Sequence, residues 1–275
     1  MSVTKESILE DLENDKLPLP TLPEVAIRVR STVDDENASM GDIANIISTD
    51  PALSARIVQV ANSALYQSAN PAENVRAAVM RMGMDTVRNL TTSLVMKQMF
   101  QASHPVVDKY LRRTWKQSTD VAALSAIIAK HHTDLPSENA LLAGLTHSIG
   151  VSPILVKAED DGDLLENLAV LDALIKDLHP TIGKAILKKW DFAPELAEVP
   201  AEYLNTNHQG ANGKADYVDV VQVALMQLVS GTEHILARTD PTQISALDRL
   251  NMRESIEEIV MDSSSEASDL SHALG

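Results

Sequence analysis

The chain has no cysteine, few aromatic residues and no apolar run long enough to cross a membrane. Zero cysteines in 275 residues exclude disulfides and thiolate metal ligands, which fits a reducing compartment. No apolar run reaches the roughly 18 residues that a membrane-spanning helix needs, and residues 1–16 lack the apolar segment of a signal peptide. We therefore expect a cytoplasmic protein without a membrane partner.

Patterns typical of β-strands are also scarce. Aromatic residues make up 3% of the chain, and β-branched residues do not alternate with polar ones, so strands have little support. Hydrophobic residues make up 44%, which is enough for a sizeable core. The composition therefore predicts an all-α protein.

Basic residues are outnumbered, and the imbalance lies in the second part of the chain. Residues 1–118 carry 13 Lys and Arg against 14 Asp and Glu, whereas the remainder carries 10 against 25. The net charge of −16 therefore comes almost entirely from residues 119–275. Because nucleic-acid binding depends on cations that neutralise phosphates, we expect no nucleic-acid partner.

Helix-capping residues divide the first part of the chain into short helices. Asp50-Pro51 places an N-cap and a first-turn proline ahead of an apolar segment. Ser39 and Asn74 open two further helices, and Gly83 is a typical residue for a helix end.

Proline marks further helix starts in the second part. A histidine–proline pair opens a long helix over residues 105–131, His179-Pro180 opens another, and a strongly apolar helix is expected over 216–236. The last residues are small and polar, which predicts a frayed end. We divide the chain into an N-terminal helix (1–16), a main domain (17–213), C-terminal helices packed on it (214–261) and a flexible tail (262–275).

Five ordered blocks share the pattern of a known family. They are LPTLPEVAIRV (19–29), TDPALSARIVQVANSALY (49–66), AAVMRMGMDTVRNL (77–90), LLAGLTHSIG (141–150) and HPTIGKAILKKWDF (179–192). Together they resemble the HDOD family, the degenerate relatives of HD-domain metal-dependent phosphohydrolases found in bacterial regulatory proteins. The resemblance implies an HD-domain-like multi-helix bundle, with an N-terminal helical lobe packed on a degenerate HD-type lobe.

The most informative position for function is Ser148. Active relatives carry an adjacent His-Asp pair, which supplies an imidazole and a bridging carboxylate to a metal ion that generates hydroxide. Here Thr146-His147-Ser148 keeps the histidine but offers a neutral hydroxyl in place of the carboxylate. The resemblance therefore implies a catalytic scaffold with a non-catalytic use.

The other ligand positions of the family are depleted too. Gln117 occupies the place of an earlier histidine, and His179 keeps the histidine of an HPxxG motif. A later histidine pair is missing from residues 198–204, where Tyr203 is among the nearest residues. The groups that remain are His147, His179 and one of Asp219 and Asp216, and Glu202 could join them.

Three such ligands could hold zinc with water as a fourth. A lone histidine on a helix of apolar and small residues is, however, more often a packed core residue. We therefore predict no catalytic residue, no metal and no cofactor, and we interpret His147, His179 and Asp219 as vestigial.

A separate feature of the N-terminal blocks is Asn62-Ser63. Asparagine is a poor residue for a helix interior, and its plain role is a buried side chain that bonds a neighbouring backbone. The alternative is a groove between the lobes that binds a ligand or partner. For this groove we name Asn62, Ser63, Arg88 and Asn89.

Three functions compete. The leading hypothesis is a non-catalytic regulatory module of signal transduction that binds other signalling proteins, as the HDOD resemblance implies. One alternative is a residual phosphohydrolase for a cyclic dinucleotide or nucleotide, with a metal held by His147, His179 and Asp219. The other is a nucleotide sensor without hydrolysis, against which the acidic second part counts because it repels phosphates.

Overall fold

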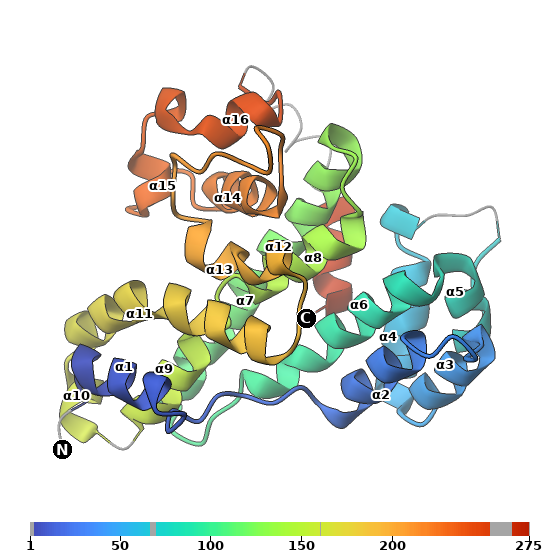
Figure 1. Cartoon of the computed structure of the whole chain (residues 1–275), viewed down its shortest axis with the longest axis horizontal. Coiled ribbons are helices and arrows are strands. Elements are labelled where there is room, and N and C mark those ends of the chain that lie inside the picture. Colours follow the sequence, from blue (N-terminus) through green and yellow to red (C-terminus); the bar gives the residue numbers. More distant parts are fainter. Residues whose placement is uncertain (1–2, 67–69, 160, 254–265, 275) are drawn as a thin grey trace.

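Helices alone build the described part of the chain, apart from one isolated bridge between Ala211 and Lys214 (Figure 1). The computed structural model describes residues 3–66, 70–159, 161–253 and 266–274. The predicted all-α fold is confirmed. Residues 1–2 of the predicted first helix, 254–261 of the predicted C-terminal helices and 262–265 of the predicted tail lie outside the described residues.

Short capped helices form the N-terminal lobe. The Asp50 side chain accepts two backbone N–H groups at the start of α4, where Pro51 takes the first helical position. Ser39 and Asn74 cap α3 and α5 in the same way, and Gly83 separates α5 from α6 with a φ of +84°. These four predictions are confirmed. The lobe consists of α2 (Glu24–Val33), α3 (Met40–Ile47), α4 (Pro51–Ala61), η1 (Ala64–Tyr66), α5 (Val75–Met82) and α6 (Met84–Val95).

The long helix α7 organises the larger lobe. It packs most extensively on α8, which also contacts α6 of the N-terminal lobe and α14. The larger lobe consists of η2 (Met96–Met99), α7 (Pro105–His132), α8 (Ser137–Thr146), α9 (Val151–Ala158), α10 (Gly162–Glu166), α11 (Leu168–Lys189), α12 (Pro194–Ala197), α13 (Val199–Glu202), α14 (Tyr217–Leu228), α15 (Ile235–Arg238), η3 (Pro241–Gln243) and α16 (Ser245–Arg249).

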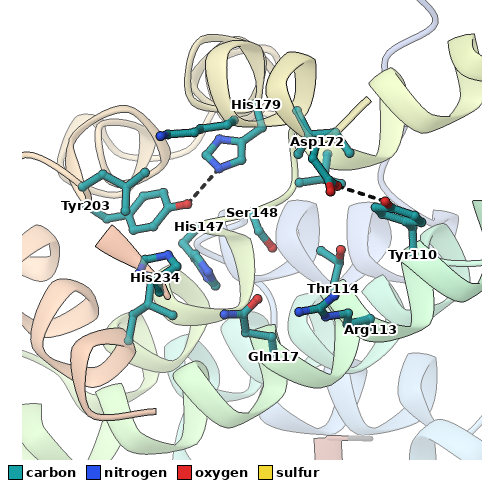
Figure 2. Close-up of a pocket in the computed structure, with 15 residues that line it drawn as sticks. Tyr110, Arg113, Thr114, Gln117, His147, Ser148, Asp172, His179, Tyr203 and His234 are labelled. Atoms are coloured by element: carbon teal, nitrogen blue, oxygen red, sulfur yellow. Dashed lines mark hydrogen bonds between the residues drawn. The ribbon is translucent and has the colours of Figure 1, made fainter. Parts of the chain in front are cut away.

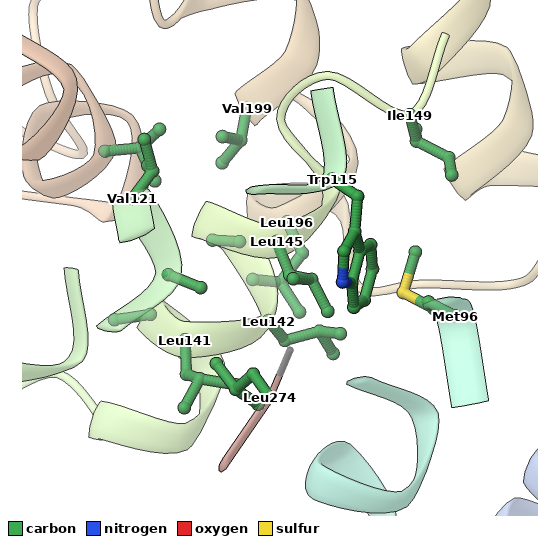
Figure 3. Close-up of a cluster of buried hydrophobic side chains, with 14 of the residues drawn as sticks. Met96, Trp115, Val121, Leu141, Leu142, Leu145, Ile149, Leu196, Val199 and Leu274 are labelled. Atoms are coloured by element: carbon green, nitrogen blue, oxygen red, sulfur yellow. The ribbon is translucent and has the colours of Figure 1, made fainter. Parts of the chain in front are cut away.

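The apolar stretch over α8 and α9 is the centre of the core. Contrary to the expectation from the sequence, Ser137–Ala158 is long and apolar enough to cross a membrane, but 89% of its most apolar window is buried inside the fold. A core helix has this composition as well, because it is apolar all round. Figure 3 shows Leu142 and Leu145 of α8 in one cluster with Trp115 of α7 and Met96.

The N-terminal segment joins the two lobes. Helix α1 (Lys5–Glu13) lies against α11, and Lys5 pairs with Asp177 of α11 at 3.0 Å (Figure 1). The chain then runs back to α2, and on the way the Pro20 carbonyl accepts a hydrogen bond from the Trp190 indole at 3.0 Å. Arg30 of α2 donates to the Trp190 carbonyl. The end of α11 therefore contacts both the N-terminal segment and α2 of the N-terminal lobe.

The sequence-based bounds of two helices are wrong. His179-Pro180 does not open a helix, because α11 runs continuously from Leu168 to Lys189 with Pro180 inside it. A proline removes one helical hydrogen bond, but the buried face of α11 outweighs that loss. The helix expected over 216–236 ends at Leu228, because Gly231 turns the chain with a φ of +75° before α15.

The end of the chain also differs from the expected frayed tail. Residues 266–274 are helical and bury Leu270, Ala273 and Leu274. These three positions lie on one face of a helix. The overall composition of the segment is polar and therefore does not indicate this apolar face. The helix is tied to α7 by a hydrogen bond from Ser271 to Asp120 at 2.7 Å.

Candidate functional site

A cavity of about 370 Å³ lies between α7, α11 and the junction of α8 with α9 (Figure 2). We call it the central pocket. It is lined by Tyr110, Arg113, Thr114 and Gln117 of α7, by His147, Ser148 and Val151 at the junction, by Asp172, Ile175, Lys176 and His179 of α11, and by Tyr203, Leu204, Leu225 and His234.

Helical periodicity explains which residues face the central pocket. On α7 they follow the spacing i, i+3, i+4 and i+7 from Tyr110, and on α11 they follow the same spacing from Asp172. Residues at this spacing share one face of a helix. Each helix therefore presents a polar stripe to the cavity, while its other faces pack in the core.

Backbone contact holds the two sides of the central pocket together. A β-carbon on Gly150, in the turn after α8, would lie 2.1 Å from the His179 carbonyl oxygen and 2.6 Å from the Gly183 nitrogen. Such distances are impossible, so only glycine allows this approach. The turn that carries His147 is thereby placed directly against α11.

His147 is buried and neutral. Its side chain is 2% exposed, and burial lowers the pKa of His147 to about 4, with a further contribution from the nearby His234. The Nδ1 atom lies 2.6 Å from the Gly144 carbonyl oxygen, and because a carbonyl only accepts, Nδ1 carries the proton. The Nε2 atom is then left as an acceptor.

His179 is bound to Tyr203. The Nε2 atom of His179 lies 2.8 Å from the Tyr203 hydroxyl, and the two rings are stacked with centroids 5.8 Å apart (Figure 2). The Tyr203 ring also meets His147 edge-on at 5.0 Å. Burial, together with His147, lowers the pKa of His179 to about 4, and burial raises the pKa of Tyr203. At neutral pH this aromatic cluster carries no charge.

Ser148 is also engaged within the protein. Its hydroxyl lies 2.7 Å from the hydroxyl of Ser118, a buried residue of α7. The place where active relatives of the family carry a carboxylate thus holds a pair of neutral hydroxyls. Gln117 projects from α7 into the same pocket (Figure 2).

The structure does not bring Asp219 to the two histidines. Asp219 is fully buried at the start of α14, where Arg249 of α16 binds it with its Nε at 2.8 Å. The other candidate, Asp216, caps α14 and binds His208 at 2.8 Å. Glu202 hydrogen-bonds Asn205. None of these three acidic residues lines the central pocket.

Metal-capable side chains do gather at the start of α14. His208, Asp216 and Asp219 offer ligand atoms within 4.8 Å of one another. Among the described residues, this is the one cluster of three side chains that could hold a metal ion. Arg249 forms an ion pair with Asp219, so the charge of this carboxylate is already balanced by a side chain and needs no metal ion. We interpret it as an ion-pair network that holds α14, α16 and the preceding loop together.

Two of the four residues of the predicted groove lie in the turn between α4 and η1 and two on α6, and they face different neighbours. Asn62 bonds both backbone polar groups of Ala72, at 2.7 and 2.9 Å, and Ser63 bonds the Val60 carbonyl. Asn62 therefore fits the plain role in backbone bonding, although its side chain is exposed. A groove between the lobes at this position stays a prediction.

Arg88 and Asn89 of α6 point in different directions. Arg88 pairs with Asp34 and Asp85, whereas the buried Asn89 donates to Asn139 of α8 at 2.6 Å. Asn89 thus joins the two lobes, and Arg88 lies near Arg30, which binds the end of α11.

Sequence reasoning missed several residues of the central pocket. Arg113 and Lys176 look like ordinary charged residues of solvated helix faces, but their helical spacing from Gln117 and His179 was an available signal. His234 lies 55 residues beyond His179, in a turn after α14, and no motif marks it.

The fold and the site together define a protein class: an all-α, HD-like bundle whose pocket keeps two buried histidines without a set of carboxylates. A sequence model of the HDOD domain family matches residues 19–205. The chain belongs to the HDOD domain family.

Solved structures agree with this assignment. A protein from Shewanella amazonensis SB2B, provisionally named a metal-dependent phosphohydrolase, is 33% identical, with a TM-score of 0.83 over 98% of this chain and 96% of that one. An HDOD domain protein of unknown function from Geobacter sulfurreducens is 20% identical, with a TM-score of 0.65 over 98% of both chains.

Two further relatives are longer proteins. A Marinobacter aquaeolei VT8 protein, provisionally named a signal transduction protein, is 23% identical with a TM-score of 0.65, over 98% of this chain and 65% of its own. An uncharacterized protein of Treponema pallidum (strain Nichols) is 23% identical over an alignment of 205 residues that covers 67% of this chain. This chain spans 39% of the length of that relative.

Proposed function

We propose that this chain is a non-catalytic regulatory module of bacterial signal transduction, which acts by binding other signalling proteins. The observation that carries the proposal is the bonding of the central pocket. Ser148 is bound to Ser118 and His179 is bound to Tyr203, so two of the inherited ligand positions are closed by internal hydrogen bonds. The provisional name of the Marinobacter aquaeolei protein, signal transduction protein, supports the same role.

The donors of the central pocket do not fit the metal ion that active HD-domain enzymes use. A catalytic centre needs several imidazole and carboxylate ligands that converge on one point. Here the Nε2 atom of His147 is an unoccupied imidazole acceptor, whereas Nε2 of His179 is bound to the Tyr203 hydroxyl. The one carboxylate of the lining, Asp172, accepts a hydrogen bond from the Tyr110 hydroxyl at 2.9 Å. We therefore derive no hydrolytic step for this chain.

The N-terminal lobe offers apolar surface for a protein partner. Ile27 of α2, Met40 of α3 and Met80 of α5 are 51%, 38% and 64% exposed. The three helices are neighbours, because α3 packs on both α2 and α5. Exposed methionines adapt readily to the shape of a partner, which supports this lobe as the interaction surface.

Metal content and hydrolysis test the non-catalytic part of the proposal. Protein purified without chelators should contain background metal only, and should not hydrolyse cyclic dinucleotides or nucleotides when Zn²⁺, Mn²⁺ or Fe²⁺ is added. Near-stoichiometric metal that is lost on His147→Ala, together with metal-dependent turnover, would instead establish the residual phosphohydrolase. That alternative draws on the free Nε2 atom of His147.

Partner capture tests the interaction part. The wild-type chain and the variant Ile27→Glu/Met80→Glu would be used as baits in lysate of the native cell, followed by mass spectrometry. A partner that the wild type retains and the variant loses supports the proposal, with Val156→Glu as the control because Val156 is an exposed apolar residue of α9 in the other lobe. Equal capture by all three baits would exclude the N-terminal lobe as the surface.

A further inference from the structure

Two cationic side chains of the central pocket have no anionic partner in the described part of the chain. Arg113 belongs to α7 and Lys176 to α11, and both residues line the cavity. Figure 2 shows these two helices on opposite sides of the cavity. Neither makes an ion pair or a hydrogen bond with another described residue. Most other arginines of the larger lobe do find a carboxylate, as Arg112 does with Asp108 at 2.6 Å. Both side chains are exposed, so their charges face the solvent and whatever enters the cavity.

The hydrogen-bonding groups of the pocket include more donors than acceptors. The neutral pair of His179 and Tyr203 owns one N–H and one O–H but forms a single hydrogen bond, so one donor is always left over. Depending on the tautomer of His179, the donor left over is its own Nδ1–H or the Tyr203 O–H. The Nδ1 atom is buried without a partner among the described groups, so a molecule in the pocket does not contact it.

His234 adds a donor from a third direction. Its Nδ1 accepts the backbone N–H of Leu236 at 3.2 Å, so the proton of the neutral ring is on Nε2. Thr114 and Gln117 contribute a hydroxyl and an amide from α7. Donors thus come from α7, from α11 and from the turn before α15.

The acidic composition of the chain does not cancel this local character. Exposed charges are largely screened beyond about 8 Å at physiological ionic strength, so distant carboxylates contribute little inside the cavity. Asp172 is the one acidic residue of the lining, against Arg113 and Lys176. The cavity, at about 370 Å³, is within the range of about 300–1,000 Å³ typical of small-molecule sites.

We propose that the central pocket binds a small phosphate ester directly, without a metal ion, through Arg113, Lys176 and the surplus donors around them. A phosphate group offers three acceptor oxygens and up to two negative charges, which suits cations placed on two sides. Neither cation belongs to the five sequence blocks shared with the HDOD family. The site would give the proposed regulatory module a small-molecule input, and it is independent of whether the partner surface is correctly placed.

Isothermal titration calorimetry of the whole chain in EDTA tests this inference. Inorganic phosphate, pyrophosphate and adenosine monophosphate are the probes, and citrate tests whether any multivalent oxyanion is sufficient. We expect saturable binding of at least one phosphate probe. Arg113→Gln and Lys176→Met should each weaken that binding by about tenfold or more, because each removes a hydrogen bond to a charged group. Arg112→Gln, which removes a cation of α7 outside the lining, should not.

Four results would overturn the inference. The first is no binding of any phosphate probe at millimolar concentration. The second is equal affinity of the wild type and the double variant Arg113→Gln/Lys176→Met, shown by circular dichroism to be folded. The third is binding that appears only when a divalent metal is added. Citrate binding as tight as that of phosphate would overturn the assignment to phosphate esters. Turnover of a probe would contradict the proposed function instead, so the two failures are distinguishable.

Discussion

Lowering the pH from about 7 to about 5 should destabilise this protein through its two buried pocket histidines. Burial lowers the pKa of His147 and of His179 from 6.5 to about 4 in the folded chain. Below about pH 6.5 the unfolded chain therefore binds protons that the folded chain does not. Stability from this source is fully present at neutral pH and is lost as the pH falls towards 4.

The magnitude follows from the size of the shift. At about pH 5 an unfolded histidine is almost fully protonated, whereas a folded one with a pKa of about 4 is mostly neutral. Compared with pH 7, this difference lowers the free energy of unfolding by about 2 kcal/mol per histidine. His147 and His179 together give an upper limit of about 4 kcal/mol, a large fraction of the stability of a typical domain. Burial also lowers the pKa of His132 and His234, so they act in the same direction.

Urea unfolding followed by far-ultraviolet circular dichroism at several pH values measures this loss. His147→Gln should reduce the slope of unfolding free energy against pH by about 1 kcal/mol per pH unit near pH 5.5. The matched control is His131→Gln, which removes an exposed histidine at the end of α7. A free energy of unfolding that does not fall between pH 7 and pH 5 would refute the neutral, buried state of these rings. So would a His147→Gln variant that keeps the wild-type slope.

Three variants, the first of them a double substitution, test other parts of the structure. Gln117→His combined with Ser148→Asp restores two ligand types, so Zn²⁺ or Mn²⁺ should raise the melting temperature of the double variant but not of the wild type. At a metal concentration of 100 Kd the corresponding gain in stability is about 2.7 kcal/mol. Arg249→Ala leaves a fully buried aspartate of α14 without its partner, so a loss of about 3–5 kcal/mol is expected in chemical denaturation, and a loss below 1 kcal/mol would contradict the ion-pair network. Gly150→Ala should cost about 3 kcal/mol or more, because the backbone of α11 must move to admit the β-carbon, whereas Gly162→Ala, with no atom within 4 Å of the new β-carbon, should be neutral in the same assay.

Local signals were sufficient to predict most of the helix starts. Ser39, Asp50 and Asn74 each cap a helix, and the long helix expected over 105–131 is α7. These features depend on a few neighbouring residues, so the sequence contains them directly. The HDOD resemblance likewise depends on contiguous blocks, and the family match confirms it.

Features that depend on packing were not predictable. Pro180 is a local signal for a helix start, but the buried face of α11 keeps the helix continuous. Leu270 and Leu274 anchor the last helix only because α7 and α8 provide a surface for them. The partner of Asp219 is Arg249, 30 residues away, and no spacing rule relates the two.

The candidate site shows the same division. His147, Ser148, His179 and Gln117 were found by motif, and all four line the central pocket. His234 was not found, because a turn of the chain returns it to the pocket. Charged residues such as Arg113 have a solvated helix face as their default interpretation, and their helical spacing from Gln117 and His179 was the one signal in the sequence that they line the same cavity.

The contact at Gly150 has a consequence for how such proteins diverge. The junction after α8 touches the main chain of α11 directly, so the spacing of the two cavity walls is fixed by peptide groups and not by whatever the side chains hold between them. Substitutions of the side chains that line the cavity can therefore accumulate one at a time, and the distance between the helices around them stays the same. A protein that loses the metal ligands of an ancestral enzyme would in this way keep a cavity of the same size.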